Sequence, residues 1–317
     1  MRGAFFRTLM TLAEKDDRVN LIVGDLGFGV VEEFAQRFPE RFLNAGVAEQ
    51  NMTSLAVGMA LSGKVVFTYS IANFPILRCL EQVRNDVCYH NANVKIVAVG
   101  GGLSYGSLGS THHATEDLAI MRSLPRMVVV APGDPAEAEA ATQAVAAHPG
   151  PCYLRLGRAG ESSVHCGEID FRLGKAIQVR DGKDLTLIST GGLLGTAVQV
   201  ADSLHRAGLQ TRLLSMHTVK PLDADAVLVA AHETGAIFTL EEHSVIGGLG
   251  GAVAELLAES SEVQVPFKRF GLPSAFMSIA GAQAYLLAQH GLSADSIASA
   301  IRSIVEKARA VTAVSRA

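Results

Sequence analysis

Short apolar runs alternate with segments of helical spacing along the whole chain, and this alternation constrains the fold more than any other feature of the sequence. Runs such as Leu21–Val23 and Met127–Ala131 are continuously apolar, as is typical of strands buried on both faces of a parallel sheet. A helix predicted over Pro135–Ala147 separates the second of these runs from the next predicted strand, Cys152–Leu156. Strands that alternate with helices in this way predict an α/β fold with doubly wound parallel sheets.

The alternation is interrupted between residues 157 and 183, where glycine, serine and charged residues are more frequent. Domain boundaries fall in segments of this composition. We therefore predict a first domain over residues 1–160, a linker over residues 161–183 and a smaller second domain over residues 184–317. The second domain is expected to contain strands at Leu185–Ser189, Thr211–Ser215, Ala236–Leu240 and Val263–Val265, and helices over residues 195–207, 250–258 and 293–309.

Charge and cysteine content exclude several classes of function. The net charge is -4 and 18% of the residues are charged, so the chain offers no basic field to hold nucleic acid or an anionic membrane surface. The four cysteines form neither a Cys-x-x-Cys pair nor a metal-ligand spacing, which indicates a cytoplasmic protein without a metal site of its own. The N-terminal segment lacks the apolar core of a signal peptide, and no run is long enough to span a bilayer.

One carboxylate, Glu49, stands in a segment that is otherwise neutral and largely apolar, Asn44–Met52. The helix that continues to Leu61 is expected to be buried, because its apolar residues recur at helical spacing. Burial of an unpaired acid costs free energy and raises its pKa, so Glu49 should have a partner that shares its proton or keeps it neutral. The alternative is that Glu49 bonds the backbone at the start of its own helix.

A glycine-rich loop over residues 100–113 ends in two histidines, His112 and His113, just before an acidic helix start. These histidines are candidates for proton transfer, although adjacent histidines on a loop can also be solvated or cap the next helix. No third ligand at a suitable spacing indicates a metal site. The turns Gly191–Gly195 and Gly247–Gly251 match neither a dinucleotide-binding nor a P-loop pattern, and we interpret them as plain strand-to-helix turns.

A set of short motifs follows one another along nearly the whole chain. Those in the first half are Asn44-Ala-Gly-Val-Ala-Glu-Gln-Asn, Gln82-Val-Arg-Asn-Asp-Val87, Gly109-Ser-Thr-His112, Met121-Arg-Ser-Leu-Pro125 and Ala131-Pro-Gly-Asp-Pro135. Those in the second half are Val219-Lys-Pro-Leu222 and Glu241-Glu-His243, the latter followed by Gly-Gly-Leu-Gly. In order and spacing they resemble the pyrimidine-binding domain and the C-terminal domain of the transketolase family. The resemblance therefore implies a parallel-sheet pyrimidine-binding domain followed by a smaller domain of the C-terminal type.

Transketolases also have an N-terminal domain that holds the diphosphate of the cofactor and its metal ion, and nothing in this sequence resembles it. Gly24-Asp25 is similar to the start of the diphosphate motif, but Leu26 stands where that motif needs glycine, so we reject this interpretation. The resemblance implies the C-terminal subunit of a split transketolase. Such a subunit homodimerises within an α2β2 heterotetramer and pairs with a separate N-terminal subunit, which mainly binds the Mg²⁺ or Ca²⁺ ion.

The activity that the resemblance implies is transfer of a two-carbon ketol unit between carbohydrate-like substrates, with thiamine diphosphate as the cofactor. One alternative is a decarboxylating or acyloin-forming enzyme with a 2-oxoacid donor, similar to deoxyxylulose-phosphate synthases or to the beta subunits of 2-oxoacid dehydrogenases. Another alternative is a non-catalytic scaffold subunit. The presence of both Glu49 and His112 argues against the scaffold, because a binding module needs neither.

By resemblance, Glu49 is the carboxyl group that shares a proton with the pyrimidine nitrogen of the cofactor, and His112 faces the substrate oxygens and moves protons. Phe74 is implied as a wall of the aromatic slot for the pyrimidine, and Asp25 as a turn acid near the cofactor. The register of that slot is open between residues 70 and 77. A core aromatic is the alternative interpretation of Phe74, and a turn or helix cap is that of Asp25.

Arg2 and Arg158 fall where transketolases place arginines on the phosphate of the acceptor substrate, and a solvated arginine is the alternative for Arg2. The sequence departs from the family at three positions that contact the substrate. Where transketolases have serine, histidine and aspartate, this chain has Gly29, Gly100 and Leu108. A site that loses groups able to hydrogen-bond sugar hydroxyls is expected to relax or change the sugar that it recognises.

Overall fold

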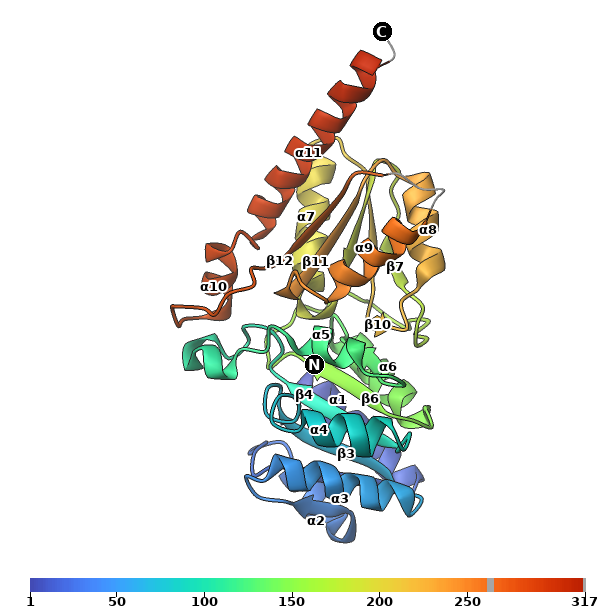
Figure 1. The fold of residues 1–317 in the computed structure, drawn as a ribbon, viewed down its shortest axis with the longest axis vertical. Helices are drawn as coiled ribbons and strands as arrows, with labels where there is room; N and C mark the ends of the chain where they lie inside the picture. Colours follow the sequence, from blue (N-terminus) through green and yellow to red (C-terminus); the bar gives the residue numbers. More distant parts are fainter. Residues whose placement is uncertain (261–264, 316–317) are drawn as a thin grey trace.

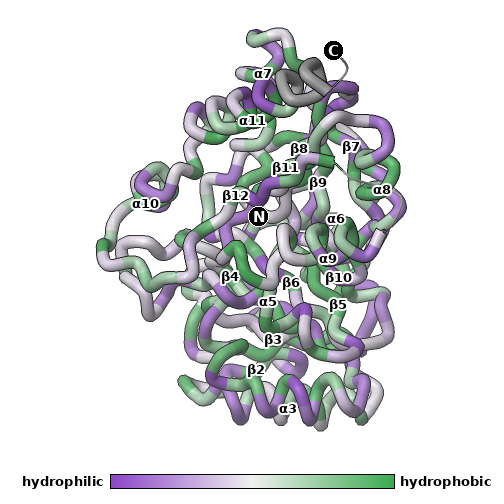
Figure 2. Tube along the Cα trace, turned by 45° about the horizontal axis from the view of Figure 1, so that its top comes forward, coloured by the Kyte–Doolittle hydropathy of each residue, from purple (hydrophilic) through white to green (hydrophobic). Residues whose placement is uncertain are grey.

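The computed structural model of the protein describes residues 1–260 and 265–315. Two β-sheets, each flanked by helices, are stacked along the long axis of the molecule, and the N-terminus lies near their junction (Figure 1). The last helix, α11 (Ala294–Ser315), extends beyond the second sheet at one end of the molecule. The strands in the interior are mostly hydrophobic, whereas the outer helix α3 (Glu49–Leu61) carries a mixture of hydrophilic and hydrophobic residues (Figure 2).

The first sheet has seven strands in the order β10-β5-β6-β4-β3-β1-β2. Its neighbours pair in parallel except at one edge, where β10 runs antiparallel to β5. The predicted doubly wound α/β fold is therefore confirmed, with an antiparallel edge strand added. The strands are β1 (Val19–Val23), β2 (Phe42–Asn44), β3 (Val65–Ile71), β4 (Val94–Val99), β5 (Val128–Val130), β6 (Cys152–Leu156) and β10 (Thr218–Lys220).

Helices cover both faces of this sheet, because successive strand residues point to opposite faces. Val128 and Val130 pack in the core beneath α1 and α6, whereas Val129 packs in the core beneath α3 and α5. A π-helix over Val83–Cys88 continues the short helix α4 on the second of these faces. The remaining helices of this half are α1 (Arg2–Lys15), α2 (Glu32–Arg37), α4 (Leu80–Gln82), α5 (Asp117–Ser123) and α6 (Pro135–Ala147).

The second sheet has five strands in the order β12-β11-β8-β9-β7, and its edge strand β7 runs antiparallel to β9. Helices α7 and α11 pack on one face of this sheet, and α8 and α9 pack on the other. Strand β7 falls within the range predicted as a linker. The elements are β7 (Ile177–Arg180), β8 (Leu185–Ser189), β9 (Thr211–Ser215), β11 (Ile237–Ser244), β12 (Phe267–Leu272), α7 (Leu194–Arg206), α8 (Ala224–Glu233), α9 (Leu249–Glu259) and α10 (Gln283–Gln289).

The strand predicted over Val263–Val265 is misplaced, as far as the described residue Val265 shows. Residues 263 and 264 lie outside the described residues, and Val265 is not part of a strand. The edge strand β12 begins after Pro266, whose carbonyl accepts a hydrogen bond from the backbone N–H of Ile237. Lys268 and Arg269 of β12 are exposed, so this strand lacks the continuous apolar run that marks the buried strands.

The two halves of the chain are joined through β10, which belongs to the second half in sequence and to the first sheet in space. Thr218 pairs with Val130, and the backbone N–H of Ala131 donates to the carbonyl of His217 at 2.7 Å. The ammonium group of Lys220 donates to the carbonyl oxygens of Arg122 and Leu124 at the end of α5. Residues from the second half therefore complete the sheet of the first half.

His217, just before β10, makes stability depend on pH. Its ring is buried, stacks on Phe171 at 3.8 Å between centroids, and accepts or donates one hydrogen bond with Thr218. Burial lowers the pKa of His217 to about 4, because the charged imidazolium loses its hydration. Between the unfolded pKa, about 6.5, and this lowered value the unfolded chain binds a proton that the folded chain does not. The contribution of His217 to the free energy of unfolding is therefore fully present above the unfolded pKa, and it is lost as the pH falls through this window.

We expect the free energy of unfolding to fall by about 2 to 3 kcal/mol between pH 7.5 and pH 4.5 because of this histidine. Denaturant unfolding at the two pH values measures the loss, and the variant His217→Phe should show a correspondingly smaller change. The control is His205→Gln, because His205 is exposed on α7. An identical pH dependence in His217→Phe and the wild type would contradict this assignment.

Candidate functional site

The carboxyl ends of the strands of the first sheet bring four loops together. Asp25 follows β1, Phe74 follows β3 and His112 follows β4, while Glu49 opens the helix after β2. The carboxyl ends of parallel strands meet at the same edge of a sheet, and ligands of open α/β sheets bind there. The fold thus gathers residues that lie far apart in the sequence into one candidate site.

Glu49 is the buried acid of this site, with 1% of its surface exposed. Its Oε2 atom accepts a hydrogen bond from Nη1 of Arg78 at 2.6 Å, and within the described residues its side chain bonds no backbone group. The alternative that Glu49 bonds the start of its own helix is therefore not observed. Gly24 is a neighbour of this side chain, since a β-carbon there would lie in van der Waals contact, 3.5 Å from Cγ of Glu49. The partner of this acid within the chain is an arginine that the sequence motifs did not indicate.

Arg78 and Phe74 form the next layer of the site. The guanidinium carbon of Arg78 lies 5.1 Å from the centroid of the Phe74 ring, within the range of a cation–π contact. The Phe74 ring in turn meets the His112 ring edge-on, with centroids 5.5 Å apart. Glu49, Arg78, Phe74 and His112 are therefore linked by direct contacts, so the structure places three of the predicted residues together.

His112 stands in a 3-10 helix over Ser110–His112 and is half-buried. Its Nδ1 atom lies 3.1 Å from the hydroxyl oxygen of Thr111, and its Nε2 atom has no hydrogen-bond partner within the described residues. The ring of Tyr105 lies on its other side, with centroids 6.5 Å apart. One ring nitrogen of His112 is thus oriented by the protein, and the other is available to a ligand.

The ring of Tyr105 occupies the space that a side chain at position 100 would need. Gly100 has a φ angle of +85°, and a β-carbon there would lie 2.1 Å from Cε2 of Tyr105, so glycine is required next to this ring. The guanidinium carbon of Arg158 lies 5.0 Å from the centroid of the same ring. Leu108 is 52% exposed, and a β-carbon on Gly29 would meet no atom within 4 Å. The residue next to His112 on this side is therefore an aromatic ring, and an arginine lies against that ring.

Asp25 and Arg2 lie at the margins of the site. Asp25 is exposed with a φ angle of +53°, and it exchanges two hydrogen bonds of 3.0 Å with the side chain of Asn44. This contact joins the loop after β1 to the end of β2 and is not a helix cap. Arg2 lies beside the buried Tyr69. Burial raises the pKa of Tyr69, and the nearby Arg2 partly offsets that rise, so Arg2 is not a freely solvated arginine.

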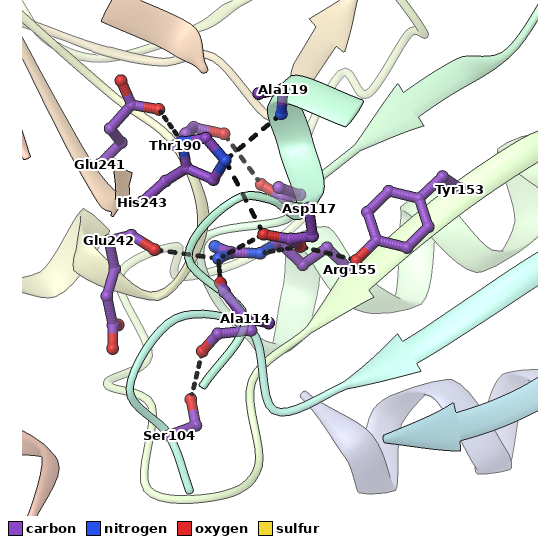
Figure 3. A network of polar contacts seen from close by, with 12 residues as sticks. Ser104, Ala114, Asp117, Ala119, Tyr153, Arg155, Thr190, Glu241, Glu242 and His243 are labelled. Atoms are coloured by element: carbon purple, nitrogen blue, oxygen red, sulfur yellow. Dashed lines mark hydrogen bonds and ion pairs between the residues drawn. The ribbon is translucent and has the colours of Figure 1, made fainter. Parts of the chain in front are cut away.

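A buried charge network holds the histidine loop against the second sheet (Figure 3). Arg155 on β6 donates to both carboxylate oxygens of Asp117, at 2.7 and 3.1 Å, and to the backbone carbonyl of Glu242 on β11 at 2.9 Å. The hydroxyl of Tyr153 donates to Asp117 at 2.6 Å. The Glu242 carboxylate accepts a hydrogen bond from the backbone N–H of Leu103 at 2.6 Å, at the start of the loop that carries Tyr105 and His112.

The Glu241-Glu-His243 motif supplies the second-sheet side of this network. Burial raises the pKa of both Glu241 and Glu242, and hydrogen bonds from backbone N–H groups or from Gln283 oppose that rise. Nε2 of His243 accepts from the backbone N–H of Ala119 at 3.3 Å, so its proton is on Nδ1, which donates to the carbonyl of Ser244. This motif positions the site and does not line it.

Within residues 1–260 and 265–315, no three histidine, cysteine or acidic side chains gather as metal ligands. In the same ranges, no helix has both the length and the apolar surface needed to cross a bilayer.

Two family models match the chain. The model "Transketolase, pyrimidine binding domain" covers residues 1–160, and the model "Transketolase, C-terminal domain" covers residues 174–297. The chain belongs to the transketolase family. The family and fold class that the sequence motifs indicated are both confirmed.

Similar transketolase-family proteins match almost the whole chain. An apulose-4-phosphate transketolase subunit of Phocaeicola vulgatus is 38% identical over 308 residues, which cover 96% of this chain and 97% of the relative. The 6-deoxy-6-sulfo-D-fructose transketolase subunit SqwH of Clostridium sp. is 39% identical over 308 residues, which cover 97% of this chain and 95% of the relative. A solved structure described as a split gene transketolase, inactive beta4 tetramer, is 37% identical with a TM-score of 0.88 and 97% coverage of both chains. This chain thus corresponds to the C-terminal part of a transketolase.

The transketolase models and relatives do not test the individual residues or the domain limits. The boundaries at residues 160 and 184 stay predictions. The same holds for the roles assigned to Glu49, His112, Phe74, Asp25, Arg2 and Arg158. Arg78 and Tyr105 join them as residues that the structure adds. The signal for Arg78 in the sequence is a cation four residues after Phe74 in an otherwise apolar run, Phe74–Leu80.

Proposed function

We propose that this chain is the C-terminal subunit of a thiamine-diphosphate-dependent enzyme that transfers a two-carbon ketol unit between carbohydrate-like substrates. The observation that carries the proposal is a buried carboxylate, Glu49, linked through Arg78 to an aromatic ring and a histidine. These residues lie at the carboxyl ends of the strands in the domain that matches the transketolase pyrimidine-binding model. The nearly full-length similarity to proteins named as transketolase subunits supports it.

The residues fit the pyrimidine half of thiamine diphosphate. A buried carboxylate needs a hydrogen-bond donor, and the bond that Glu49 makes is to a half-exposed side chain, which a ring nitrogen can replace. Phe74 offers an aromatic face next to that carboxylate, through its contact with Arg78. When bound, thiamine diphosphate supplies the carbon nucleophile that accepts and returns the two-carbon unit. Glu49 would hold a proton at the pyrimidine nitrogen, which is the general acid–base role that its burial suits.

His112 would move protons at the substrate oxygens. Its Nδ1 faces the Thr111 hydroxyl, which leaves Nε2 for the substrate. The Phe74 and Tyr105 rings both contact the region of the imidazole, with centroids 5.5 and 6.5 Å from it, and limit where it can turn. The network that includes Glu242 anchors the loop that carries it, so the position of the imidazole depends on the packing of the second sheet.

The substrate is proposed to carry an anionic group and to differ from the standard ketose phosphates. Gly29, Gly100 and Leu108 offer no polar side chain, whereas Tyr105 lies near His112 and Arg158 lies over the Tyr105 ring. An arginine suits a phosphate or sulfonate, because its planar fork forms two parallel hydrogen bonds to such groups. Both relatives are named for sugars with a phosphate or sulfo group, which supports this choice. Arg2 would assist Arg158 from its place beside Tyr69.

The proposed assembly is an α2β2 heterotetramer in the cytoplasm. An N-terminal subunit would hold the diphosphate and the Mg²⁺ or Ca²⁺ ion, and Asp25 would lie near the cofactor at the interface between subunits. Phe28 and Val47 support an interface there, because they are 77% and 73% exposed and flank Gly24 and Glu49 in sequence. Exposed apolar groups around an incomplete site mark interaction surfaces.

A 2-oxoacid donor is the second candidate. The observation that favours it is Leu108, an exposed apolar side chain where transketolases bind a sugar hydroxyl. Both candidates use Glu49 in the same way, so they differ in the donor and not in the cofactor chemistry.

The test is reconstitution of this chain with a partner subunit that carries the Gly-Asp-Gly diphosphate motif. We expect thiamine diphosphate binding and donor turnover by the mixture and neither by this chain alone. A donor panel of ketose phosphates, unphosphorylated ketoses and pyruvate identifies the substrate class, and turnover of pyruvate would favour the second candidate. Full-affinity binding of cofactor with magnesium by this chain alone would contradict the need for a partner, and a mixture that binds no cofactor would overturn the proposal.

A further inference from the structure

We propose that Arg78 is a placeholder, which occupies the site of the cofactor's pyrimidine ring in the free subunit and has to leave before the cofactor binds. The inference rests on the proposed function and adds a competition for Glu49 and Phe74. Arg78 makes two contacts at once: its Nη1 lies 2.6 Å from Oε2 of Glu49, and its guanidinium carbon lies 5.1 Å from the centroid of the Phe74 ring.

These two contacts are those that a flat nitrogen heterocycle would make. A guanidinium is planar and delocalised, carries N–H donors in its plane, and stacks on aromatic faces. Arg78 occupies Oε2 of Glu49 and lies over the ring of Phe74. A pyrimidine that hydrogen-bonds this carboxylate while it lies against Phe74 would therefore compete with the guanidinium for the same space.

The structure also shows which partner is able to move. The side chain of Glu49 is 1% exposed and that of Arg78 is 48% exposed. The carboxylate is therefore fixed in the protein, whereas the guanidinium already has half of its surface in solvent. Within the described residues, the Arg78 side chain makes a single hydrogen bond, and its partner is Glu49. Arg78 can turn out into water without breaking a second polar contact.

The ion pair serves the free subunit. A buried carboxylate without a partner destabilises a fold, because its lost hydration is not replaced. Arg78 provides that replacement until the cofactor does so. The cofactor then binds the fraction of molecules in which Arg78 has turned out, so its apparent affinity is lower than the intrinsic affinity by that fraction.

Two opposite effects of one substitution follow. Removal of Arg78 should destabilise the free chain and, at the same time, tighten cofactor binding by the two-subunit complex. If the ion pair were purely structural, removal of Arg78 would lower both the stability of the free chain and the affinity for the cofactor. A substrate-binding arginine would change the KM of an anionic donor and leave cofactor affinity unchanged.

The experiment compares Arg78→Ala with Arg84→Ala, a control arginine that is exposed on the π-helix and bonds the side chain of its neighbour Asn85. Thermal unfolding of the free chain and calorimetric titration of the two-subunit complex with thiamine diphosphate are measured. Arg78→Ala should unfold several degrees lower than the wild type. It should bind the cofactor about 5- to 10-fold more tightly, which corresponds to about 10 to 20% of wild-type molecules having Arg78 turned out. Arg84→Ala should change neither property. In a Glu49→Gln background, the gain in affinity from Arg78→Ala should be smaller, because a neutral hydrogen bond replaces the ion pair that holds Arg78 in the site.

Equal or weaker cofactor binding by Arg78→Ala would overturn the inference while leaving the proposed function intact. Absence of cofactor binding in the wild type and in every variant would overturn the proposed function, and the placeholder with it. If Arg78→Ala does not fold, Arg78→Gln takes its place, since it can still donate a hydrogen bond to Glu49 but carries no charge. The glutamine variant should bind the cofactor more tightly than the wild type, and binding at wild-type affinity would overturn the inference.

Discussion

Replacement of Glu49 by glutamine is expected to lower donor turnover by the reconstituted enzyme by about 10²- to 10⁴-fold, which is the contribution of a positioned acid–base group. Glutamine keeps the shape of the side chain and can still accept a hydrogen bond from Arg78, but it cannot share a proton with a ring nitrogen. Steady-state kcat for the preferred donor measures the effect. Because Glu49 is buried, the thermal unfolding of the variant has to be measured alongside.

The matched control is Glu81→Gln, which changes an exposed glutamate at the start of α4. We expect it to retain wild-type turnover. A Glu49→Gln variant that folds, binds its partner subunit and turns over at the wild-type rate would show that Glu49 is not the acid–base group. The ion pair with Arg78 would then be a structural feature alone.

Replacement of Arg155 by methionine is expected to destabilise the protein by about 3 to 5 kcal/mol, the usual cost of removing one partner from a buried ion pair. Asp117 would keep the Tyr153 hydroxyl as a donor, but its carboxylate would lose the guanidinium that neutralises it. The Glu242 carbonyl would also lose a donor across the junction of the two sheets. Denaturant unfolding of the free chain measures the change in the free energy of unfolding.

Arg180→Met is the control for this experiment. Arg180 pairs with Asp202 at 2.6 Å, but both side chains are partly exposed, and such pairs contribute about 0 to 1 kcal/mol. The double variant Asp117→Leu with Arg155→Met should be less destabilised than the sum of the two single variants, because no unpaired charge remains. If Arg155→Met costs no more than Arg180→Met, the network does not determine the stability of the junction.

Strands that are buried on both faces could be predicted from the sequence almost to the residue. The predicted and observed bounds agree for Cys152–Leu156, Leu185–Ser189 and Thr211–Ser215. Burial selects apolar residues at every position of such strands, so the pattern is local and visible. Edge strands differ, because one side faces solvent or another segment. Strands β7, β10 and β12 were therefore missed or misplaced, since short, half-exposed strands have no continuous apolar run.

The candidate site could be predicted only in part. Glu49 is buried as its apolar surroundings predicted, but the rest of its helix α3 is buried only in part, since Leu55 and Leu61 are 39% and 63% exposed. The resemblance implied only that His112 faces the substrate, and the structure adds its contact with Phe74. The contact between Glu49 and Arg78 could not be predicted, because it joins side chains 29 residues apart, one at the start of α3 and one in the turn before α4, and no local pattern records it. Tyr105 was missed for the same reason: the sequence showed that Gly100 lacks a side chain, but the fold shows which ring fills the space.

The position of β10 has a consequence for synthesis of the chain on the ribosome. Residues 19–156 supply six strands of the first sheet, but the apolar strand β5 keeps an unpaired edge until Thr218–Lys220 have left the exit tunnel. Unpaired strand edges attract other nascent chains. The first half therefore emerges as an unfinished structure, and its release as a separate fragment would leave a permanently adhesive edge. Nascent chains of this protein are most exposed to misassembly between the completion of β6 and the arrival of β10.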